Sequence, residues 1–412
     1  MNIRLLYLTA ETYPTFRADV RVLFGKVLPQ HGIHSDIVAG KTPGVTGDSS
    51  VWDGGESNLC DVSGGPISKH FKTFFHGIRC MLEADRKRYH AIQVRDMPIA
   101  AAIGLLIARF KGLRFYYWMS YPMPEGQILL ARERGLSTGL MKFIFPWLNG
   151  RIGRLLLYRV VLPNVNHVFV QSNQMKIDLI KLGIRSEIMT SVPMGVDLEE
   201  LQNLDISPMN DIHLAGKRVL VYLGTLIRPR KIETLFEMLA IVKREFPNVL
   251  LVLVGDAQDE PHQRWLEVKA EEAGVKDQLL WTGWLSMFEG WRYVCAAEVG
   301  LSPFPRGYLL DSASPTKVPE YLALGVPVVC NENPDQEQVI LQSGAGVCAP
   351  YTALDFANAV IQLLKMDKCK RNEMVIKGKS YISKCRDYRI IGSNLAHSYR
   401  DLLLKEGYGH DN

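Results

Sequence analysis

Several features that assign a protein to a function class at once are missing from this sequence of 412 residues. The seven cysteines are scattered and include no C-x-x-C pair, which argues against a disulfide framework or a cysteine zinc site and favours a reducing compartment. No apolar run reaches the roughly 18 residues that a membrane-spanning helix needs. The run over residues 3–8 contains Arg4 and precedes no cleavage site, so we expect a first strand there and not a signal peptide.

Signals for common ligands are also missing. No G-x-G-x-x-G motif follows residues 3–8 or 221–223, which argues against a nicotinamide cofactor. No Asp-x-Asp pair stands in a suitable loop and the ten histidines are scattered, so we expect neither a metal nor a bound cofactor. The net charge of +5 is too small for a dedicated nucleic-acid-binding protein, although it favours anionic ligands or an anionic membrane surface.

What the sequence does contain is a series of short runs rich in Val, Ile and Leu, separated by helical patterns. Continuous apolar runs of this kind indicate parallel strands that are buried on both faces, and hence a doubly wound α/β architecture. The expected strands are residues 3–8, 35–38, 91–94, 115–118, 167–170, 218–223, 249–254, 278–281, 299–302, 326–330 and 346–348.

A break in this alternation predicts two domains. The stretch 192–197 and the polar stretch 205–213 precede a fresh strand at 218, so we expect a linker there. The domains are then residues 1–195 and 196–386, followed by a helix over 388–406. Two open α/β sheets of this kind are expected to direct the carboxyl ends of their strands toward a shared cleft, where such sheets bind ligands.

The densest chemical signal lies in residues 302–330. Ser314-Pro315 predicts a helix start, and Gly325 predicts its end. A helix start at the mouth of an α/β sheet offers backbone N–H groups to phosphate, and Thr316 and Lys317 add a hydroxyl and a cation. Glu320, one turn later, is placed to accept hydrogen bonds from sugar hydroxyls. The alternative is a well-capped helix with a surface glutamate.

A second signal follows the strand at 218–223. Gly224 and Thr225 lead into a loop that carries three cations, Arg228, Arg230 and Lys231. Clustered cations repel one another unless an anion lies between them, which favours a diphosphate site over a solvated turn. Two weaker signals are the glycines that end later strands, Gly255 and Gly283.

Residues 132–162 mix cations with large apolar side chains. This composition is typical of an amphipathic element on an anionic bilayer, and the alternative is a long interdomain-facing helix with solvated arginines. The residues expected to meet a membrane are Phe143, Phe145, Trp147, Arg151 and Arg154.

Together these motifs resemble one family. Gly224-Thr-Leu-x-Arg-x-Arg-Lys, Val254-Gly-Asp, Trp281-Thr-Gly, Pro193-Met-Gly-Val-Asp and Ser314-Pro-Thr-Lys-x-x-Glu-Tyr-Leu-Ala-x-Gly-x-Pro-Val-Val resemble the retaining, nucleotide-sugar-dependent glycosyltransferases of family 4. The likeness is strong over residues 192–350 and weaker before them. It implies the GT-B fold, two Rossmann-like doubly wound domains facing a central cleft, with residues 387–412 packing back on the first domain.

The resemblance also implies roles. Arg230 or Lys231 would contact the diphosphate, Glu320 would hold the ribose, residues 314–316 would take the phosphates, and Gly283 would lie against the base. The donor would be a UDP-, GDP- or ADP-sugar and the transferred group a hexose or an N-acetylhexosamine. No metal is expected, because Arg228, Arg230, Lys231 and Lys317 take its charge-neutralising part.

The sequence departs from the family pattern at three places. Ser312 stands where the family has the first glutamate of an acidic pair, and Asp311 beside it is the candidate substitute. The loop after the first strand lacks the Gly-Gly pair and carries Arg17 instead. The strand end that often bears a histidine does not have one, so the acceptor-side candidates are Asp96, Ser120, Tyr121 and Glu125.

The expected function is therefore sugar transfer, with retention, to an acceptor hydroxyl. The segment 132–162 favours a lipid-linked acceptor in polysaccharide or glycolipid assembly, at the cytoplasmic face of the inner membrane. Two alternatives stay open: a catalytically silent GT-B protein that binds a nucleotide sugar as a scaffold, and an epimerase or phosphorylase on the same fold.

Overall fold

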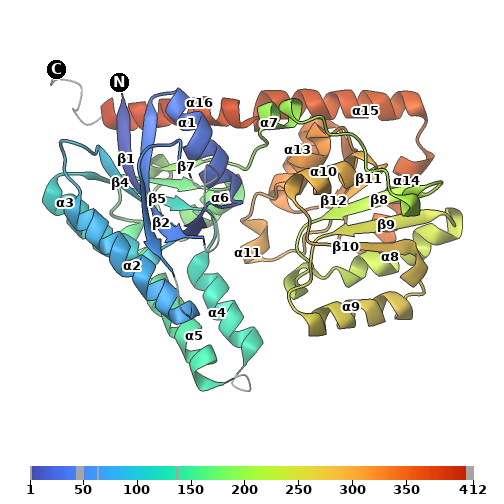
Figure 1. The fold of residues 1–412 in the computed structure, drawn as a ribbon, viewed down its shortest axis with the longest axis horizontal. Helices are drawn as coiled ribbons and strands as arrows, with labels where there is room; N and C mark the ends of the chain where they lie inside the picture. Colours follow the sequence, from blue (N-terminus) through green and yellow to red (C-terminus); the bar gives the residue numbers. More distant parts are fainter. Residues whose placement is uncertain (1, 43–50, 63–64, 136–138, 405–412) are drawn as a thin grey trace. The chain divides into compact units, whose positions relative to one another are not determined.

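The computed structural model describes residues 2–42, 51–62, 65–135 and 139–404 (Figure 1). They divide into two compact units: unit 1 is Met1–Met194 with Tyr388–Asn412, and unit 2 is Gly195–Asp387. Each unit is a parallel sheet covered by helices on both faces, which confirms the expected α/β class.

The sheet of unit 1 has the strand order β3-β2-β1-β4-β5-β6-β7, and every pairing is parallel. The strands are β1 Ile3–Tyr13, β2 Ile33–Lys41, β3 Ser57–Asp61, β4 Ala91–Arg95, β5 Arg114–Met119, β6 His167–Val170 and β7 Met189–Ser191. Its helices are α1 Leu28–Gln30, α2 Pro66–Glu83, α3 Pro98–Lys111, α4 Met123–Arg134, α5 Leu140–Leu155, α6 Asn173–Lys181 and α16 Tyr388–Leu404, with π-helical segments at Asp19–Val27 and Leu156–Val161.

The sheet of unit 2 has the order β10-β9-β8-β11-β12-β13, again all parallel. The strands are β8 Arg218–Leu223, β9 Val249–Val254, β10 Leu279–Gly283, β11 Val299–Ser302, β12 Val328–Asn331 and β13 Gly346–Ala349. The helices are α7 Leu198–Asn203, α8 Glu233–Glu245, α9 Glu260–Glu272, α10 Met287–Cys295, α11 Tyr308–Asp311, α12 Lys317–Ala323, α13 Pro334–Ser343, α14 Ala353–Lys365 and α15 Lys368–Tyr381, which a π-helical segment Ile382–Arg386 extends.

Both strand orders reverse direction at one point. In unit 1 this switch point lies between β1 and β4, and in unit 2 it lies between β8 and β11. Sheets of this Rossmann type bind ligands outside the carboxyl ends of the strands that flank the switch point. The loops after β1, β4, β8 and β11 are therefore the places to look for a site.

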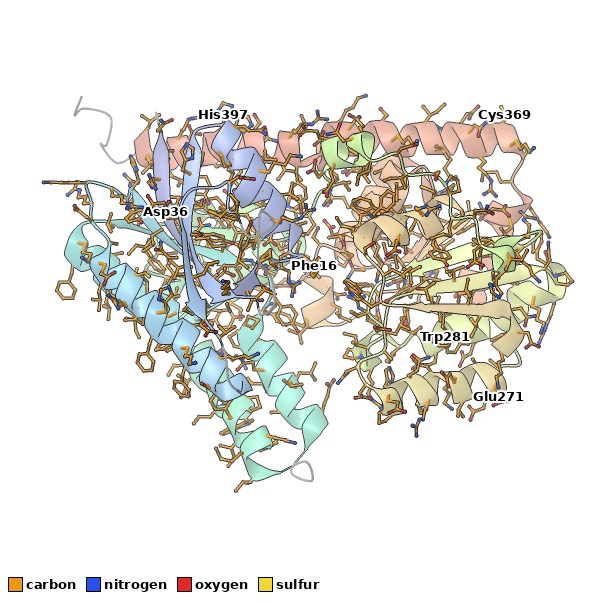
Figure 2. The ribbon with its side chains drawn as sticks, viewed as in Figure 1. Phe16, Asp36, Glu271, Trp281, Cys369 and His397 are labelled. Atoms are coloured by element: carbon orange, nitrogen blue, oxygen red, sulfur yellow. The ribbon has the colours of Figure 1, made fainter. Side chains whose placement is uncertain are left out.

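Buried side chains tie the elements of each unit together. In unit 1, the carboxylate of Asp36 on β2 is buried and accepts hydrogen bonds from Arg4, Arg88 and Tyr89 (Figure 2). In unit 2, Trp281 lies on β10 (Figure 2). Its ring makes an edge contact with Phe236, with ring centroids 5.9 Å apart. Because the buried Asp36 carboxylate needs these three donors, their positions help to fix the register of β2.

The helix α16 completes the core of unit 1. Six of its side chains are buried in the cluster that covers one face of the sheet: Tyr388, Ile391, Leu395, Ala396, Tyr399 and Leu403. The hydroxyl of Tyr399 hydrogen-bonds the side chain of Gln93 on β4 at 2.5 Å. The described part of the helix reaches Leu404, and the last two residues of the expected helix lie outside the described residues.

Candidate functional site

Two cations meet at the switch point of unit 2. The Arg230 guanidinium donates a hydrogen bond to the hydroxyl of Tyr222 on β8 at 3.1 Å, and the Lys317 ammonium donates to the same hydroxyl at 3.2 Å. The Lys317 ammonium lies 4.4 Å from the centre of the Tyr222 ring. In unit 2, whose residues are all described, neither cation forms an ion pair. We call Tyr222, Arg230 and Lys317 the cation cluster.

The aromatic ring of Phe304 lies against the same two cations. Its centroid is 5.7 Å from the Arg230 guanidinium carbon and 5.5 Å from the Lys317 ammonium nitrogen. Phe304 follows β11, and Arg230 follows β8. The loops after the two strands of the switch point thus each contribute a side chain to this positively charged wall, formed by the cation cluster and Phe304.

Glycines let the backbone approach this wall closely. Gly224 has φ +136, and a Cβ there would lie 2.9 Å from an Arg230 nitrogen and 3.0 Å from the Lys317 side chain. A Cβ on Gly255, φ +144, would lie 2.4 Å from the Gly224 carbonyl oxygen. Gly283 pairs with Gly255 in an isolated bridge. A side chain at Gly224 would fill the space beside the cations, and one at Gly255 would collide with the Gly224 backbone.

Burial changes the proton affinities of the two ionisable groups of α12. The pKa of Lys317 falls well below its usual value, chiefly through burial and also because Arg230 is near. Burial raises the pKa of Glu320 to about 7, against smaller lowering contributions from Trp291, Thr316 and Lys317. A buried cation beside a second cation is stabilised when an anion binds between them.

The start of α12 differs from the prediction. The helix begins at Lys317 with Thr316 as its N-cap residue, and no side chain caps it. The Ser314 hydroxyl does not cap the helix but donates to buried Asp335 at 2.8 Å, and Asp335 pairs with buried Arg386 at 2.8 Å. Pro315 and Pro319 supply no N–H and α12 has only seven residues, so this helix start offers few free backbone donors.

Three other predicted residues lie apart from the cation cluster or have another partner. Asp311, at the end of α11, forms an ion pair with Arg306 at 2.8 Å. The exposed Arg228 guanidinium lies 5.8 Å from the Trp265 ring centre. Lys231 has a left-handed backbone with φ +47 and an exposed side chain, and its carbonyl accepts a hydrogen bond from Tyr351 at 3.3 Å. Thr225 does join the cluster, because its carbonyl lies 3.4 Å from the Arg230 donor.

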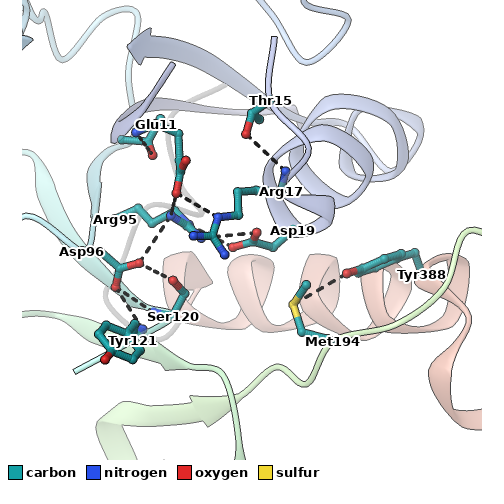
Figure 3. A network of polar contacts seen from close by, with 11 residues as sticks. Glu11, Thr15, Arg17, Asp19, Arg95, Asp96, Ser120, Tyr121, Met194 and Tyr388 are labelled. Carbon is teal, nitrogen blue, oxygen red and sulfur yellow. Dashed lines mark hydrogen bonds and ion pairs between the residues drawn. The ribbon is translucent and has the colours of Figure 1, made fainter. Parts of the chain in front are cut away.

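A second polar cluster surrounds the switch point of unit 1. The buried Arg95 guanidinium, at the end of β4, pairs with Asp19 at 2.9 Å, with Glu11 at 3.3 Å and with Asp96 at 3.4 Å (Figure 3). Arg17 approaches Glu11 at 3.0 Å from the loop after β1. Three carboxylates around two guanidiniums leave one excess negative charge.

Asp96 has the most constrained position in that cluster. Its backbone is left-handed, with φ +54, and its carboxylate is buried. It accepts hydrogen bonds from the Ser120 backbone N–H at 2.8 Å, from the Ser120 hydroxyl and from the Tyr121 backbone N–H at 3.3 Å (Figure 3). Burial nevertheless raises its pKa above the usual value for an aspartate, although Arg95 lowers it. Predicted residues Asp96, Ser120 and Tyr121 thus lie together.

Glu125, the remaining acceptor-side candidate, lies on α4. It accepts a hydrogen bond from the Tyr158 hydroxyl at 3.1 Å and pairs with Arg154 on α5 at 3.6 Å. Burial raises its pKa. The ion pair of Glu125 with Arg154 thus connects one acceptor-side candidate to the segment 132–162, which was expected to contact a membrane.

That segment folds as the end of α4, the helix α5 and the π-helical turn after it, and residues 136–138 lie outside the described ranges. The face of α5 carries a run of exposed apolar side chains: Leu140, Met141, Ile144, Phe145, Trp147, Leu148, Ile152 and Leu155. The Arg151 guanidinium lies 5.8 Å from the Trp147 ring centre. In the described ranges, no helix combines the length and apolarity needed to cross a membrane.

A comparison with known families shows what unit 2 is similar to. A family model described as glycosyl transferases group 1 matches residues 210–381, which hold every residue of the cation cluster. This part of unit 2 is similar to group 1 glycosyltransferase domains. Among the residues that the structure describes, no three His, Cys, Asp or Glu side chains gather so as to hold a metal ion.

One curated relative is similar at the sequence level. Alpha-monoglucosyldiacylglycerol synthase from Streptococcus pneumoniae (strain ATCC BAA-255 / R6) is 24% identical over 230 residues, or 53% of this chain and 48% of that protein. The chain thus spans about half the length of the curated relative that it matches.

Solved structures are similar over almost the whole chain. Sucrose-phosphate synthase from Thermosynechococcus elongatus has a TM-score of 0.70 at 16% identity. The match covers 98% of this chain and 100% of that chain. Anabaena Alr3699/HepE in complex with UDP-glucose has a TM-score of 0.66 at 15% identity, with 97% of this chain and 100% of that chain covered. The fold is therefore GT-B, as the sequence predicts.

Sequence reasoning missed several residues of unit 2. Tyr222, Phe304 and Trp291 surround the charged residues that the sequence predicts. The one local signal for any of them is the place of Tyr222 near the end of a predicted strand. A buried amide network was also missed: Gln336 bonds Ser302 and Asn331, and Asn331 in turn bonds the backbone of Phe304. Ser302 and Gln336 are 34 residues apart and Phe304 and Asn331 are 27 apart, so no local pattern reveals these two contacts.

Proposed function

We propose that this protein is a retaining glycosyltransferase that moves a hexose or an N-acetylhexosamine from a nucleotide diphosphate sugar to a hydroxyl of a lipid-linked acceptor. The observation that carries the proposal is the cation cluster inside a region that is similar to group 1 glycosyltransferase domains. Two cations share one tyrosine hydroxyl, and one of them is buried with a lowered pKa. A diphosphate between them would relieve their repulsion.

In the proposed reaction, the bond between the anomeric carbon and the diphosphate oxygen breaks as the acceptor oxygen bonds to the same face of that carbon. The acceptor's proton passes to the departing diphosphate. Arg230 and Lys317 stabilise the charge that develops on the diphosphate, which is usually the largest catalytic term in such chemistry. Glu320 holds the ribose hydroxyls. The proposal needs no metal, because the two cations neutralise the diphosphate.

Asp311 is the proposed contact to the transferred sugar. It stands next to Ser312, where relatives in family 4 have a glutamate, and its pairing with Arg306 holds it in place. A UDP-sugar is the first donor to test, since the Anabaena structure contains UDP-glucose.

The lipid acceptor and the place of action are supported by α5. Its exposed apolar run and the cations Arg151 and Arg154 suit an anionic bilayer. The curated relative, by its name, makes a glucosylated diacylglycerol. We accordingly place the protein on the cytoplasmic face of the inner membrane, bound peripherally.

The test is a donor panel. Purified protein is incubated with UDP-, GDP- and ADP-sugars and a bacterial lipid extract, and both thermal stabilisation and released nucleoside diphosphate are measured. Stabilisation by one donor together with lipid-dependent release supports the proposal. Stabilisation without release under any acceptor identifies a silent binding protein. Conversion of the donor sugar without an acceptor identifies an epimerase, and turnover that requires free phosphate identifies a phosphorylase.

A variant separates a ligand-binding role of Lys317 from a structural one. Lys317→Met removes a buried cation, so the unliganded protein should be as stable as the wild type or more stable, while its affinity for UDP should fall by about tenfold or more. The matched control is Lys243→Met on α8, whose exposed ammonium bonds only a backbone carbonyl. Equal UDP affinity in Lys317→Met and wild type would refute the diphosphate site.

A further inference from the structure

Unit 1 contains an apolar cavity next to Asp96. Its volume is about 300 Å³, and it lies among α2, α3, α4 and α5. Its apolar lining includes Phe71 and Phe74 of α2, Pro98 of α3, Pro124 of α4, and Phe145 and Gly153 of α5. None of these side chains offers a hydrogen bond, so the cavity suits a hydrocarbon and not a sugar.

Four polar side chains line the cavity: His70, Asp96, Gln127 and Asn149. The side chains of Gln127 and Asn149 bond each other, which satisfies part of their hydrogen-bonding capacity. Asp96 contributes a buried carboxylate that Ser120 and Tyr121 fix in place. The cavity therefore combines a long apolar wall with one oriented acceptor of hydrogen bonds, an arrangement that matches a hydrocarbon chain ending in a hydroxyl.

The cavity is continuous with the exposed apolar face of α5. Phe145 lines the cavity and is also 37% exposed, and Phe71 on the α2 side is 50% exposed. Exposed cations flank that face at Lys142 and Arg151 on α5. Apolar entry groups beside cations are what a chain leaving an anionic bilayer would meet first.

We propose that this cavity binds one hydrocarbon chain of the acceptor lipid and presents the acceptor hydroxyl to Asp96. The inference rests on the proposed function and adds to it a chain-binding site. The volume is at the lower end of that of small-molecule sites, roughly 300–1,000 Å³, so it admits one chain and not two.

Decanol, a straight-chain alcohol, is the probe. Calorimetric titration of the full-length protein, without vesicles, should give one bound decanol per chain. Gly153→Leu should weaken that binding by about tenfold or more, because its side chain grows into the cavity. Gly153→Ala should retain it, since a Cβ there meets Pro98 and Pro124 at 3.7 Å, an ordinary contact.

Phe74→Asp is a second variant that places a charge in the wall without adding bulk, and it should also lose decanol binding. The control is Phe110→Asp, the same substitution at a phenylalanine of α3 that is 92% exposed and lies outside the cavity. Phe110→Asp should bind decanol as the wild type does. Folding of each variant is checked by circular dichroism and by thermal unfolding.

The outcomes separate this inference from the proposed function. Absent decanol binding, or equal binding in Gly153→Leu, Phe74→Asp and wild type, overturns the chain site, while diphosphate release with the lipid extract would leave the transferase proposal standing. Conversely, decanol binding lost in both cavity variants supports the chain site even where no donor stabilises the protein. In the transfer assay, Gly153→Leu should lower kcat/KM for long-chain lipids and not for glycerol.

Discussion

Glu320 is a carboxylic acid whose proton affinity lies near neutrality. Because burial raises its pKa from 4.5 to about 7, the folded protein binds more protons than the unfolded chain between these values. The contribution of Glu320 to the free energy of unfolding therefore decreases as the pH rises through this window.

Glu320→Gln removes this ionisation and keeps the shape of the side chain. We expect the unliganded variant to unfold at a higher temperature than wild type at pH 8, by roughly 2–4 °C, the shift that about 1 kcal/mol causes in a domain of this size. The difference should shrink as the pH falls toward 5, near the unfolded pKa of 4.5. Thermal unfolding followed from pH 5 to 8 measures this, with the exposed Glu237→Gln on α8 as control. A constant difference across the range would contradict a titrating Glu320.

Gly224 tests whether the cations need an open backbone beside them. Gly224→Ala places a Cβ 2.9 Å from Arg230 and 3.0 Å from Lys317, so the cations must move apart. UDP affinity should fall about tenfold, which is 1.4 kcal/mol. Gly216→Ala is the control, since Gly216 also has a positive φ, +70, but has no atom within 4 Å of the added Cβ. Equal losses in both variants would assign the effect to backbone strain alone.

At the scale of elements, α16 can be tested with two leucines of one helix. Leu395 is 2% exposed and packs in the core of unit 1, whereas Leu404 is 58% exposed. Leu395→Ala should lower the free energy of unfolding by about 2–5 kcal/mol. Leu404→Ala should change it by less than about 0.5 kcal/mol. Urea denaturation of unit 1, followed by near-ultraviolet circular dichroism, compares them, and similar losses would mean that α16 frays from the sheet.

The elements also mark how far the sequence can predict the fold. All eleven predicted strands are present, because each is a continuous apolar run between helices. Two strands were missed: β3, Ser57–Asp61, is a polar edge strand with exposed ends, and β7, Met189–Ser191, has only three residues. Neither has an apolar run for its partners to bury.

For the candidate site, the sequence predicted the charged residues better than the side chains with which they form hydrogen bonds and ion pairs. Arg230, Lys317 and Glu320 stand in a spaced motif that a single sequence displays. The buried pair of Asp335 and Arg386 is separated by 51 residues, and it takes the Ser314 hydroxyl that the sequence had assigned to a helix cap. Long-range hydrogen bonds of this kind depend on the tertiary fold and leave no local pattern.

At the scale of the whole molecule, unit 2 is one continuous stretch of chain and carries the cation cluster. A fragment of residues 195–387 should therefore fold and bind UDP with an affinity within about threefold of that of the full chain, a difference of under 1 kcal/mol. Calorimetry on both proteins measures this. The Lys317→Met fragment is the control, and a folded fragment without affinity for UDP would show that unit 1 supplies part of the nucleotide site.

Unit 1, in contrast, is formed by two separate segments of the chain, and the second segment contributes the helix α16. During synthesis, β1 to β7 leave the ribosome long before Tyr388, so one face of their sheet waits for its covering helix while the whole of unit 2 is made. At about 5–20 residues per second, the 193 residues of unit 2 take roughly 10–40 s. For that time the apolar side chains that will contact Leu395 and Tyr399 are open to chaperones and to other nascent chains.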